Sequence, residues 1–226
     1  MAGTKQGDRG PRREGYLWAS WVAANALGEL VGLGLTGAIG ALILSRQSML
    51  GDSRAPFELL LAVVSGACVE GVAVGLAQWT VLRRVLAGIA RRTWILATAA
   101  GAAVAWALGM LPSTMMDTGG EASAPGPEPS AATILVMTIG LGIVGGAILA
   151  GPQWLILRRH LAGAGWWVLF NAAAWAAGMP IAFAAVSAVI DGREIAFGAG
   201  LLLATGAVVG AIHGLGLVWL VRERAV

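Results

Sequence analysis

The sequence is poor in cysteine, histidine and charged residues. Its single cysteine, Cys68, excludes an internal disulfide and any Cys-x-x-Cys redox or zinc site. The two histidines, His160 and His213, do not form a His-x-x-x-His metal motif. Charged residues make up 12% of the chain, whereas soluble domains contain about 25%, so the chain lacks the polar surface of a water-exposed globule. We therefore expect no metal site and no cofactor.

Long apolar segments are abundant instead. Apolar residues account for 58% of the chain, and the mean hydropathy is +0.78. Six apolar stretches exceed the roughly 18 residues that mark a membrane-spanning helix. The sequence therefore predicts an all-α membrane protein with six transmembrane helices. The stretches run from Tyr16 to Leu44, Phe57 to Leu82, Thr93 to Met116, Ala131 to Leu157, Trp166 to Ile190, and Ile195 to Val221.

Three copies of one phrase indicate how these helices are organised. Trp-x-x-x-Asn/Thr-Ala begins at Trp21, Trp94 and Trp167, with a spacing of 73 residues each time. A fixed period indicates a duplicated structural unit, and each unit contains two spans. Successive units then keep one orientation, which predicts a pseudo-threefold ring of helical hairpins about the membrane normal. We expect a single membrane domain over 1–226, with a basic tail (1–15) and three tandem two-helix repeats (16–90, 91–163 and 164–226).

A second phrase, Gln-Trp-x-x-Leu-Arg, occurs at Gln78 and Gln153 and in a weaker form around Trp219. By this repeated phrase the chain resembles a set of uncharacterised bacterial multi-pass membrane proteins. The resemblance covers most of the chain and implies no activity. Mitochondrial carriers share the threefold geometry, but their Pro-x-Asp/Glu-x-x-Lys/Arg motif is absent from the helix ends of this sequence.

The basic residues are distributed asymmetrically. Twelve of the fifteen Lys and Arg lie in the N-terminal tail or at alternate helix ends, while the opposite loops collect seven acids. This is the positive-inside pattern, and it predicts that both termini face the cytoplasm. The Ala-, Gly- and Arg-rich composition indicates a bacterial inner membrane. Despite a pI near 10.0, the pattern argues against a nucleic-acid partner. The expected partner is the lipid bilayer, with another membrane protein as a possibility.

Eight of the ten tryptophans lie near the arginine-rich helix ends. Tryptophan prefers the headgroup level, where its ring is apolar and its N–H stays hydrated, so we interpret these residues as interface anchors. The alternative is an aromatic collar around a cytoplasmic vestibule or partner site. Trp106 and Trp175 lie near mid-membrane, where they are expected to pack a core or line a pocket.

Three ionisable residues, Glu29, Glu70 and His213, fall inside the predicted spans. Their repeat equivalents are small or apolar; His213, for example, aligns with Ala73 and Ile148. Charge inside a bilayer is costly, so a functional interpretation is the default. The two acids belong to one hairpin at nearly the same depth, and we expect the carboxylates to face each other and share a proton or hold a cation. The alternative is a neutral, hydrogen-bonded acid and a histidine bonded to a backbone carbonyl.

Other polar and small residues recur inside the spans. Asn25, Asn171, Gln78 and Gln153 are predicted to form interhelical hydrogen bonds, with the lining of a polar pathway as the alternative. Glycines four residues apart on the even-numbered spans are predicted to allow close helix packing.

Two functions are compatible with this sequence. The first is a small pore or carrier for protons, cations or a small solute, with Glu29, Glu70 and His213 on its pathway. The second is a non-catalytic scaffold, assembly or accessory subunit that binds another membrane protein or lipid. We expect no enzyme, because Ser65 and His213 only faintly resemble the serine and histidine helices of rhomboid-type proteases, and the glycine two residues before the serine is missing.

Overall fold

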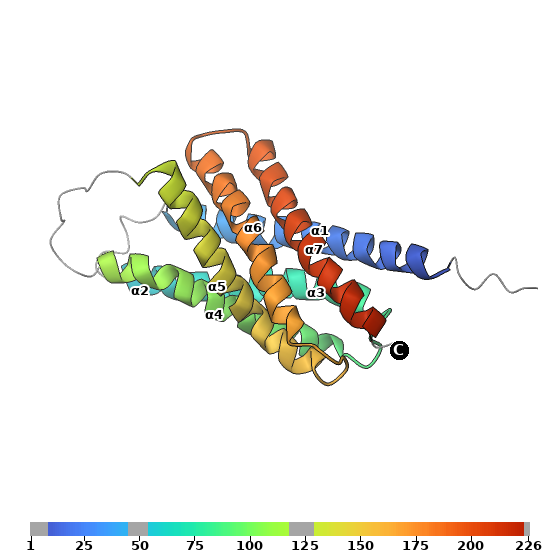
Figure 1. Ribbon diagram of the computed structural model, residues 1–226. Helices are drawn as coiled ribbons and strands as arrows, with labels where there is room; N and C mark the ends of the chain where they lie inside the picture. Colours follow the sequence, from blue (N-terminus) through green and yellow to red (C-terminus); the bar gives the residue numbers. More distant parts are fainter. Residues whose placement is uncertain (1–8, 45–53, 118–128, 224–226) are drawn as a thin grey trace, which may run out of the picture.

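The computed structural model describes residues 9–44, 54–117 and 129–223, which form a bundle of helices (Figure 1). Six of its helical spans are long and apolar enough to cross a membrane, which confirms the prediction of an all-α, six-span protein. The elements are α1 (Arg9–Leu44), α2 (Arg54–Ser65), the π-helix η3 (Gly66–Glu70), α3 (Gly71–Leu82), α4 (Arg91–Asp117), α5 (Ala131–Leu157), α6 (Trp166–Ile190) and α7 (Ile195–Glu223).

The second span is not one regular helix. The sequence predicts an unbroken helix over 57–82, but α2 passes through η3 before it continues as α3. In η3 the N–H of Gly71 donates to the carbonyl of Gly66, the five-residue step of a π-helix. Gly66 faces the indole of Trp106 so closely that a Cβ on this glycine would overlap the ring. The π segment ends at Glu70, one of the two predicted membrane acids, and π-bulges are frequent at functional sites.

The spans form a closed ring. Each contacts its neighbours in the chain, through α1 with α3, α3 with α4, α4 with α5, α5 with α6, and α6 with α7, and α7 returns to α1. Three hairpins follow one another around this ring: α1 with α2–η3–α3, then α4 with α5, then α6 with α7. Figure 1 shows α1 extending past its neighbours at its N-terminal end. We call the end with the α3–α4 and α5–α6 turns the arginine-rich end, and the end with the α6–α7 turn the acidic end.

Glycines allow neighbouring helices to approach closely, as the spacing predicts. A Cβ on Gly71 would lie 2.5 Å from the Cα of Ala99, so α3 and α4 meet backbone to backbone. Gly146 meets Asn171 across the α5–α6 contact, and Gly206 meets Asn25 across the α7–α1 contact, each with a carbonyl oxygen 2.5 Å from the added Cβ. Small residues permit such contacts where lipid offers no hydrophobic drive for association.

Three of the tryptophans are core residues, and for these the prediction of interface anchors is wrong. Trp21, Trp94 and Trp167 are completely buried. Trp167 meets Trp21 and Trp94 edge to face, with ring centroids 6.0 and 6.5 Å apart. Leu82 and Leu157 pack in the same cluster. We refer to the three indoles as the tryptophan layer; with these leucines it fills the bundle toward its arginine-rich end.

Candidate functional site

The three buried indoles each donate a hydrogen bond to the helix that precedes them around the ring. Trp94 on α4 donates to Oε1 of Gln78 on α3 at 3.2 Å, and Trp167 on α6 donates to Oε1 of Gln153 on α5 at 3.0 Å. Trp21 on α1 donates to Nδ1 of His213 on α7 at 2.7 Å. Every junction between hairpins therefore has one tryptophan donor and one polar acceptor, which is glutamine at two junctions and histidine at the third.

This contact revises the position of His213 in the repeat. An alignment through Trp219 places His213 opposite Ala73 and Ile148, but the structure gives it the bond that the glutamines make elsewhere. The glycine pattern carries this signal in the sequence, because glycines stand seven and three residues before His213 just as they do before Gln78. The third hairpin therefore keeps its glycines and acceptor in register, while its last turns contain extra residues before Trp219.

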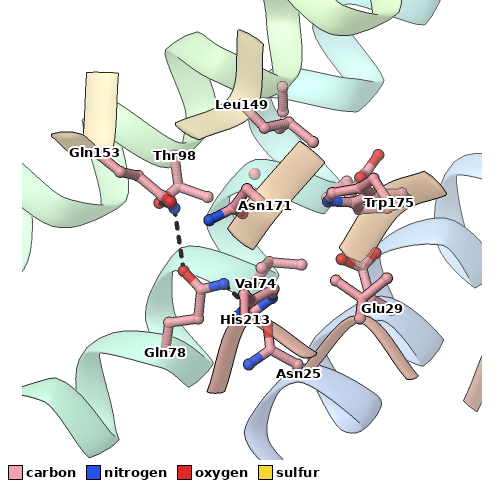
Figure 2. Close-up of a pocket in the computed structure, with 14 residues that line it drawn as sticks. Asn25, Glu29, Val74, Gln78, Thr98, Leu149, Gln153, Asn171, Trp175 and His213 are labelled. Carbon is pink, nitrogen blue, oxygen red and sulfur yellow. Dashed lines mark hydrogen bonds between the residues drawn. The ribbon is translucent and has the colours of Figure 1, made fainter. Parts of the chain in front are cut away.

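The amide side chains extend these bonds across the centre of the bundle. Gln78 donates to Oδ1 of Asn25 at 2.9 Å, which joins α3 to α1. Gln153 donates to Oε1 of Gln78 at 3.1 Å and to Oγ1 of Thr98 at 2.9 Å, which joins α5 to α3 and α4 (Figure 2). The predicted interhelical bonds are thus present for Asn25, Gln78 and Gln153. Asn171 instead donates to the backbone carbonyl of Trp167 in its own helix, at 2.9 Å.

The two acids lie inside the bundle on the acidic-end side of these amides. Glu29 is 2% exposed and Glu70 is 5% exposed, so neither carboxylate points into lipid. Gly32, one turn after Glu29, packs on Glu70, with an added Cβ only 2.8 Å from the Glu70 Cα. Glu70 accepts a hydrogen bond from the indole of Trp106. Oε2 of Glu29 is buried without a hydrogen-bond partner, and Trp175 lines the same cavity as this carboxylate (Figure 2).

A small internal cavity brings the predicted residues together. Its volume is about 20 Å³, enough for one water molecule, which needs roughly 10–15 Å³ by this measure, and too small for an organic solute. All seven residues predicted for a polar pathway line it, together with seven others (Figure 2). The seven predicted residues are Asn25, Glu29, Glu70, Gln78, Gln153, Asn171 and His213.

Most of the lining comes in sets of three, one residue from each hairpin. Asn25 has the counterparts Thr98 and Asn171, 73 residues apart, and all three line the cavity. The next turn of the same helices contributes Glu29, Ala102 and Trp175 at the same spacing. Because the equivalents of Glu29 are alanine and tryptophan, the cavity wall at this level is acidic on the first hairpin only.

The sequence does not identify every residue of the site. It does not assign Trp106 as the partner of Glu70, nor the tryptophan layer as the donors of the network, because both depend on which helix faces each ring. It also misses Thr36, about two turns beyond Glu29 toward the acidic end of α1. Thr36 is buried, and its hydroxyl has no hydrogen-bond partner.

The amide side chains at the cavity bond mainly to other side chains of the protein. The side-chain oxygens of Asn25, Gln78 and Gln153 each already accept an N–H, so they are engaged within the protein. Among the described residues, no group of three or more His, Cys, Asp and Glu side chains is placed to hold a metal. What the site offers is a pair of buried carboxyl groups next to room for one water.

No protein-family profile matches this sequence, and the searches found no significant similarity to a curated protein or to a solved structure. The fold and the site therefore define only the class: a multi-pass integral membrane protein with six apolar spans and a buried carboxylate pair.

Proposed function

We propose that the protein is a small pore or carrier that moves protons across a bacterial inner membrane through Glu29 and Glu70. The observation that carries this proposal is the buried Glu29 carboxylate, whose Oε2 has no partner and which shares a water-sized cavity with Glu70. An ionised carboxylate in a dry interior is costly, and two of them cannot both ionise cheaply. When a water in the cavity gives a proton to one of the two carboxylates, the cost of burying two ionised groups is removed.

A proton fits the site better than a metal cation or a solute. Hard cations such as Mg²⁺ and Ca²⁺ take about six or more oxygen ligands. The side-chain oxygens of Asn25, Gln78 and Gln153 already accept N–H groups, and Glu70 accepts the indole N–H of Trp106, so few oxygen atoms at the cavity are without a hydrogen bond. The cavity volume of about 20 Å³ leaves no room for a larger substrate in this conformation.

The proposal includes a pseudo-threefold axis along the membrane normal and cytoplasmic termini. The equivalent tryptophan bonds at the three junctions and the lining residues in sets of three support the axis. The clustering of Lys and Arg at one end supports the orientation. In this orientation the tryptophan layer lies on the cytoplasmic side of the carboxylates, and the unpaired hydroxyl of Thr36 lies about 10 Å outward of Glu29.

A proton route follows from this order. The carboxylates exchange protons with the outer face of the membrane along the part of α1 that contains Thr36. The tryptophan layer is the barrier toward the cytoplasm, because the described side chains buried there are its indoles, their bonded acceptors and the surrounding aliphatic residues. Transfer across the bundle then requires this layer to open, most directly at the bond between Trp21 and His213.

Proton flux in proteoliposomes tests the proposal. A potassium gradient with valinomycin drives proton uptake, and a trapped pH dye reports it. We expect flux with the native protein and flux at the level of protein-free liposomes with Glu29→Gln or Glu70→Gln. The matched control is Glu223→Gln, which removes an exposed acid at the end of α7 and should leave flux unchanged.

The glutamine variants should unfold within about 1 kcal/mol of the native protein, because the amide keeps the shape and most hydrogen bonds. Native-level flux in both variants would refute the carboxylate pathway, and so would a native protein that never exceeds empty liposomes.

The second candidate is a non-transporting scaffold or accessory subunit. The observation that favours it is the network itself: the buried amides bond to one another and to the indoles at the junctions, as side chains of a structural core do. This candidate predicts no proton flux from the native protein, and recovery of a specific membrane-protein partner after extraction in mild detergent that is retained in both glutamine variants.

A further inference from the structure

A second hollow lies away from the carboxylate site, between the acidic-end halves of α5, α6 and α7. Its volume is about 550 Å³, within the range of roughly 300–1,000 Å³ typical of ligand sites. Leu135 of α5, Phe183 of α6 and Phe197 of α7 line it, and each is 44–50% exposed. These are apolar side chains at the surface of a membrane-spanning bundle, so the hollow is a groove open to lipid.

The floor of the groove is a straight track of small residues on α6. Pro180, Ala184 and Ala188 line it at intervals of four residues, so they lie on one stripe of the helix. The stripe is about 12 Å long. Bulkier side chains of α5 and α7 also line the groove, so an apolar track runs along α6 with the hydroxyls of Thr138 and Ser187 in its lining. This is the shape of a segment of acyl chain lying along a helix.

The mouth of the groove carries one charge of each sign, held by a defined turn. Gly192 follows the end of α6 and adopts φ +72°. Its N–H donates to the carbonyl of Val189 at 3.1 Å, and the N–H of Arg193 donates to the carbonyl of Ala188 at 2.9 Å. This is a Schellman motif, which fixes the residues around the glycine. Asp191 and Arg193 both line the groove.

The arginine is also positioned from the other side. Its guanidinium carbon lies 5.6 Å from the ring centroid of Phe197, a cation–π contact with a groove-lining side chain of α7. A cation held over an apolar groove suits a phosphate, and guanidinium binds phosphate through paired N–H groups. The neighbouring carboxylate of Asp191 suits an ammonium group.

We propose that this groove binds one aminophospholipid of the phosphatidylethanolamine type, with an acyl chain along α6, the phosphate at Arg193 and the ammonium group at Asp191. An anionic phospholipid such as phosphatidylglycerol would satisfy Arg193 but has no ammonium group, so Asp191 would face a neutral glycerol without a counter-charge. The paired charges at the mouth therefore favour the zwitterionic lipid over the anionic one. The groove is separate from the carboxylate cavity, so this proposal does not depend on proton transport.

Photocrosslinking in nanodiscs tests the site. The protein is reconstituted with a phosphatidylethanolamine probe that carries a diazirine on its acyl chain, and crosslinked peptides are identified by mass spectrometry. We expect labelling concentrated on the first turns of α5 and the second half of α6, above that on the exposed side of α4 around Leu96 and Leu108. Equal labelling of these surfaces would overturn the proposal.

Two variants separate the groove from its mouth. Ala184→Phe fills the floor, and Leu108→Phe is its matched control on an exposed, apolar position of α4. Arg193→Gln changes the exposed turn and removes its contact with the Phe197 ring of α7, and it should lower groove labelling about tenfold, the factor expected from one charge-assisted bond. If groove labelling survives both Ala184→Phe and Arg193→Gln, the site is refuted.

The headgroup assignment has its own test. Asp191→Asn should abolish the preference for the phosphatidylethanolamine probe over the same diazirine probe built on phosphatidylglycerol. A native protein that already prefers the phosphatidylglycerol probe would contradict the assignment of the ammonium group to Asp191.

Discussion

His213 offers a direct test of how the ring is held together, because one substitution should be tolerated and another should not. Gln78 and Gln153 accept the indole N–H at two junctions, and His213 accepts it at the third. His213→Gln therefore installs the acceptor that the protein already uses twice. His213→Leu introduces an apolar side chain of similar bulk and leaves the N–H of Trp21 without an acceptor.

The magnitude follows from the burial of the two partners. Trp21 is 0% exposed and His213 is 1% exposed, and Trp21 is not among the residues that line the water-sized cavity, so bulk water does not reach the indole N–H to replace the lost acceptor. An unsatisfied buried donor costs about 1–3 kcal/mol, and single hydrogen bonds within membrane proteins contribute about 0.6 and at most about 1.7 kcal/mol. We expect His213→Leu to lower the free energy of unfolding by about 1–2 kcal/mol, and His213→Gln to lower it by less than about 0.5 kcal/mol.

Reversible unfolding in mixed micelles of dodecyl maltoside and sodium dodecyl sulfate, followed by far-ultraviolet circular dichroism, measures both values. Val221→Ala, a substitution near the same end of α7 that removes no hydrogen-bonding group, controls for general loosening of the helix. Equal destabilisation by glutamine and leucine would refute the equivalence of the three junctions. A leucine variant as stable as the native protein would show that the Trp21 bond contributes nothing.

Two further predictions concern packing and orientation. A Cβ on Gly142 would overlap the backbone of Trp175, whereas nothing lies within 4 Å of a Cβ on Gly140. Gly142→Ala should therefore lower the free energy of unfolding by about 2 kcal/mol or more. In the same titration, Gly140→Ala should leave the free energy of unfolding equal or slightly higher. In a Cys68→Ser background, an impermeant maleimide applied to whole cells should label Glu194→Cys at the acidic end and spare Ala87→Cys at the arginine-rich end; the opposite pattern would reverse the proposed topology.

The helices themselves could be predicted almost completely. The predicted spans 131–157 and 166–190 have the same bounds as α5 and α6. The length of an apolar run is sufficient to predict a helix here, because a single segment in lipid can satisfy its own backbone hydrogen bonds only as a helix. The first helix begins at Arg9, before the apolar run that starts at Tyr16. An apolar run predicts only the part of a helix that lies in lipid, and the helix itself extends beyond that part.

The π-helix could not be predicted. Its five residues, Gly66 to Glu70, have no composition that separates them from the surrounding helix. The two ends of the π-helix both contact Trp106 of α4. Gly66 packs on its ring, and Glu70 accepts a hydrogen bond from its indole N–H. Both contacts join different helices, so they appear only once α2 and α4 are placed side by side.

The tryptophans show why depth alone does not determine a role. Trp21 and Trp166 both stand near an arginine-rich helix end, yet Trp21 is fully buried and Trp166 is 53% exposed. The difference is the direction in which each side chain leaves its helix, together with the acceptor that Trp21 finds on α7. Sequence places Glu29 and Glu70 at one depth, and the structure adds that they share a cavity. Whether that cavity carries protons stays a prediction.

The contact between α7 and α1 has a consequence for assembly. Head-to-tail contacts between like units build an open filament unless their rotation closes, in which case they build a ring of fixed size. Here α7 packs on α1, so the described helices close into a ring and do not leave α1 and α7 as two separate ends. The closure also places the first and last helices next to each other. Closure of the ring is therefore a property of the contacts between helices, and above all of the contact between α7 and α1.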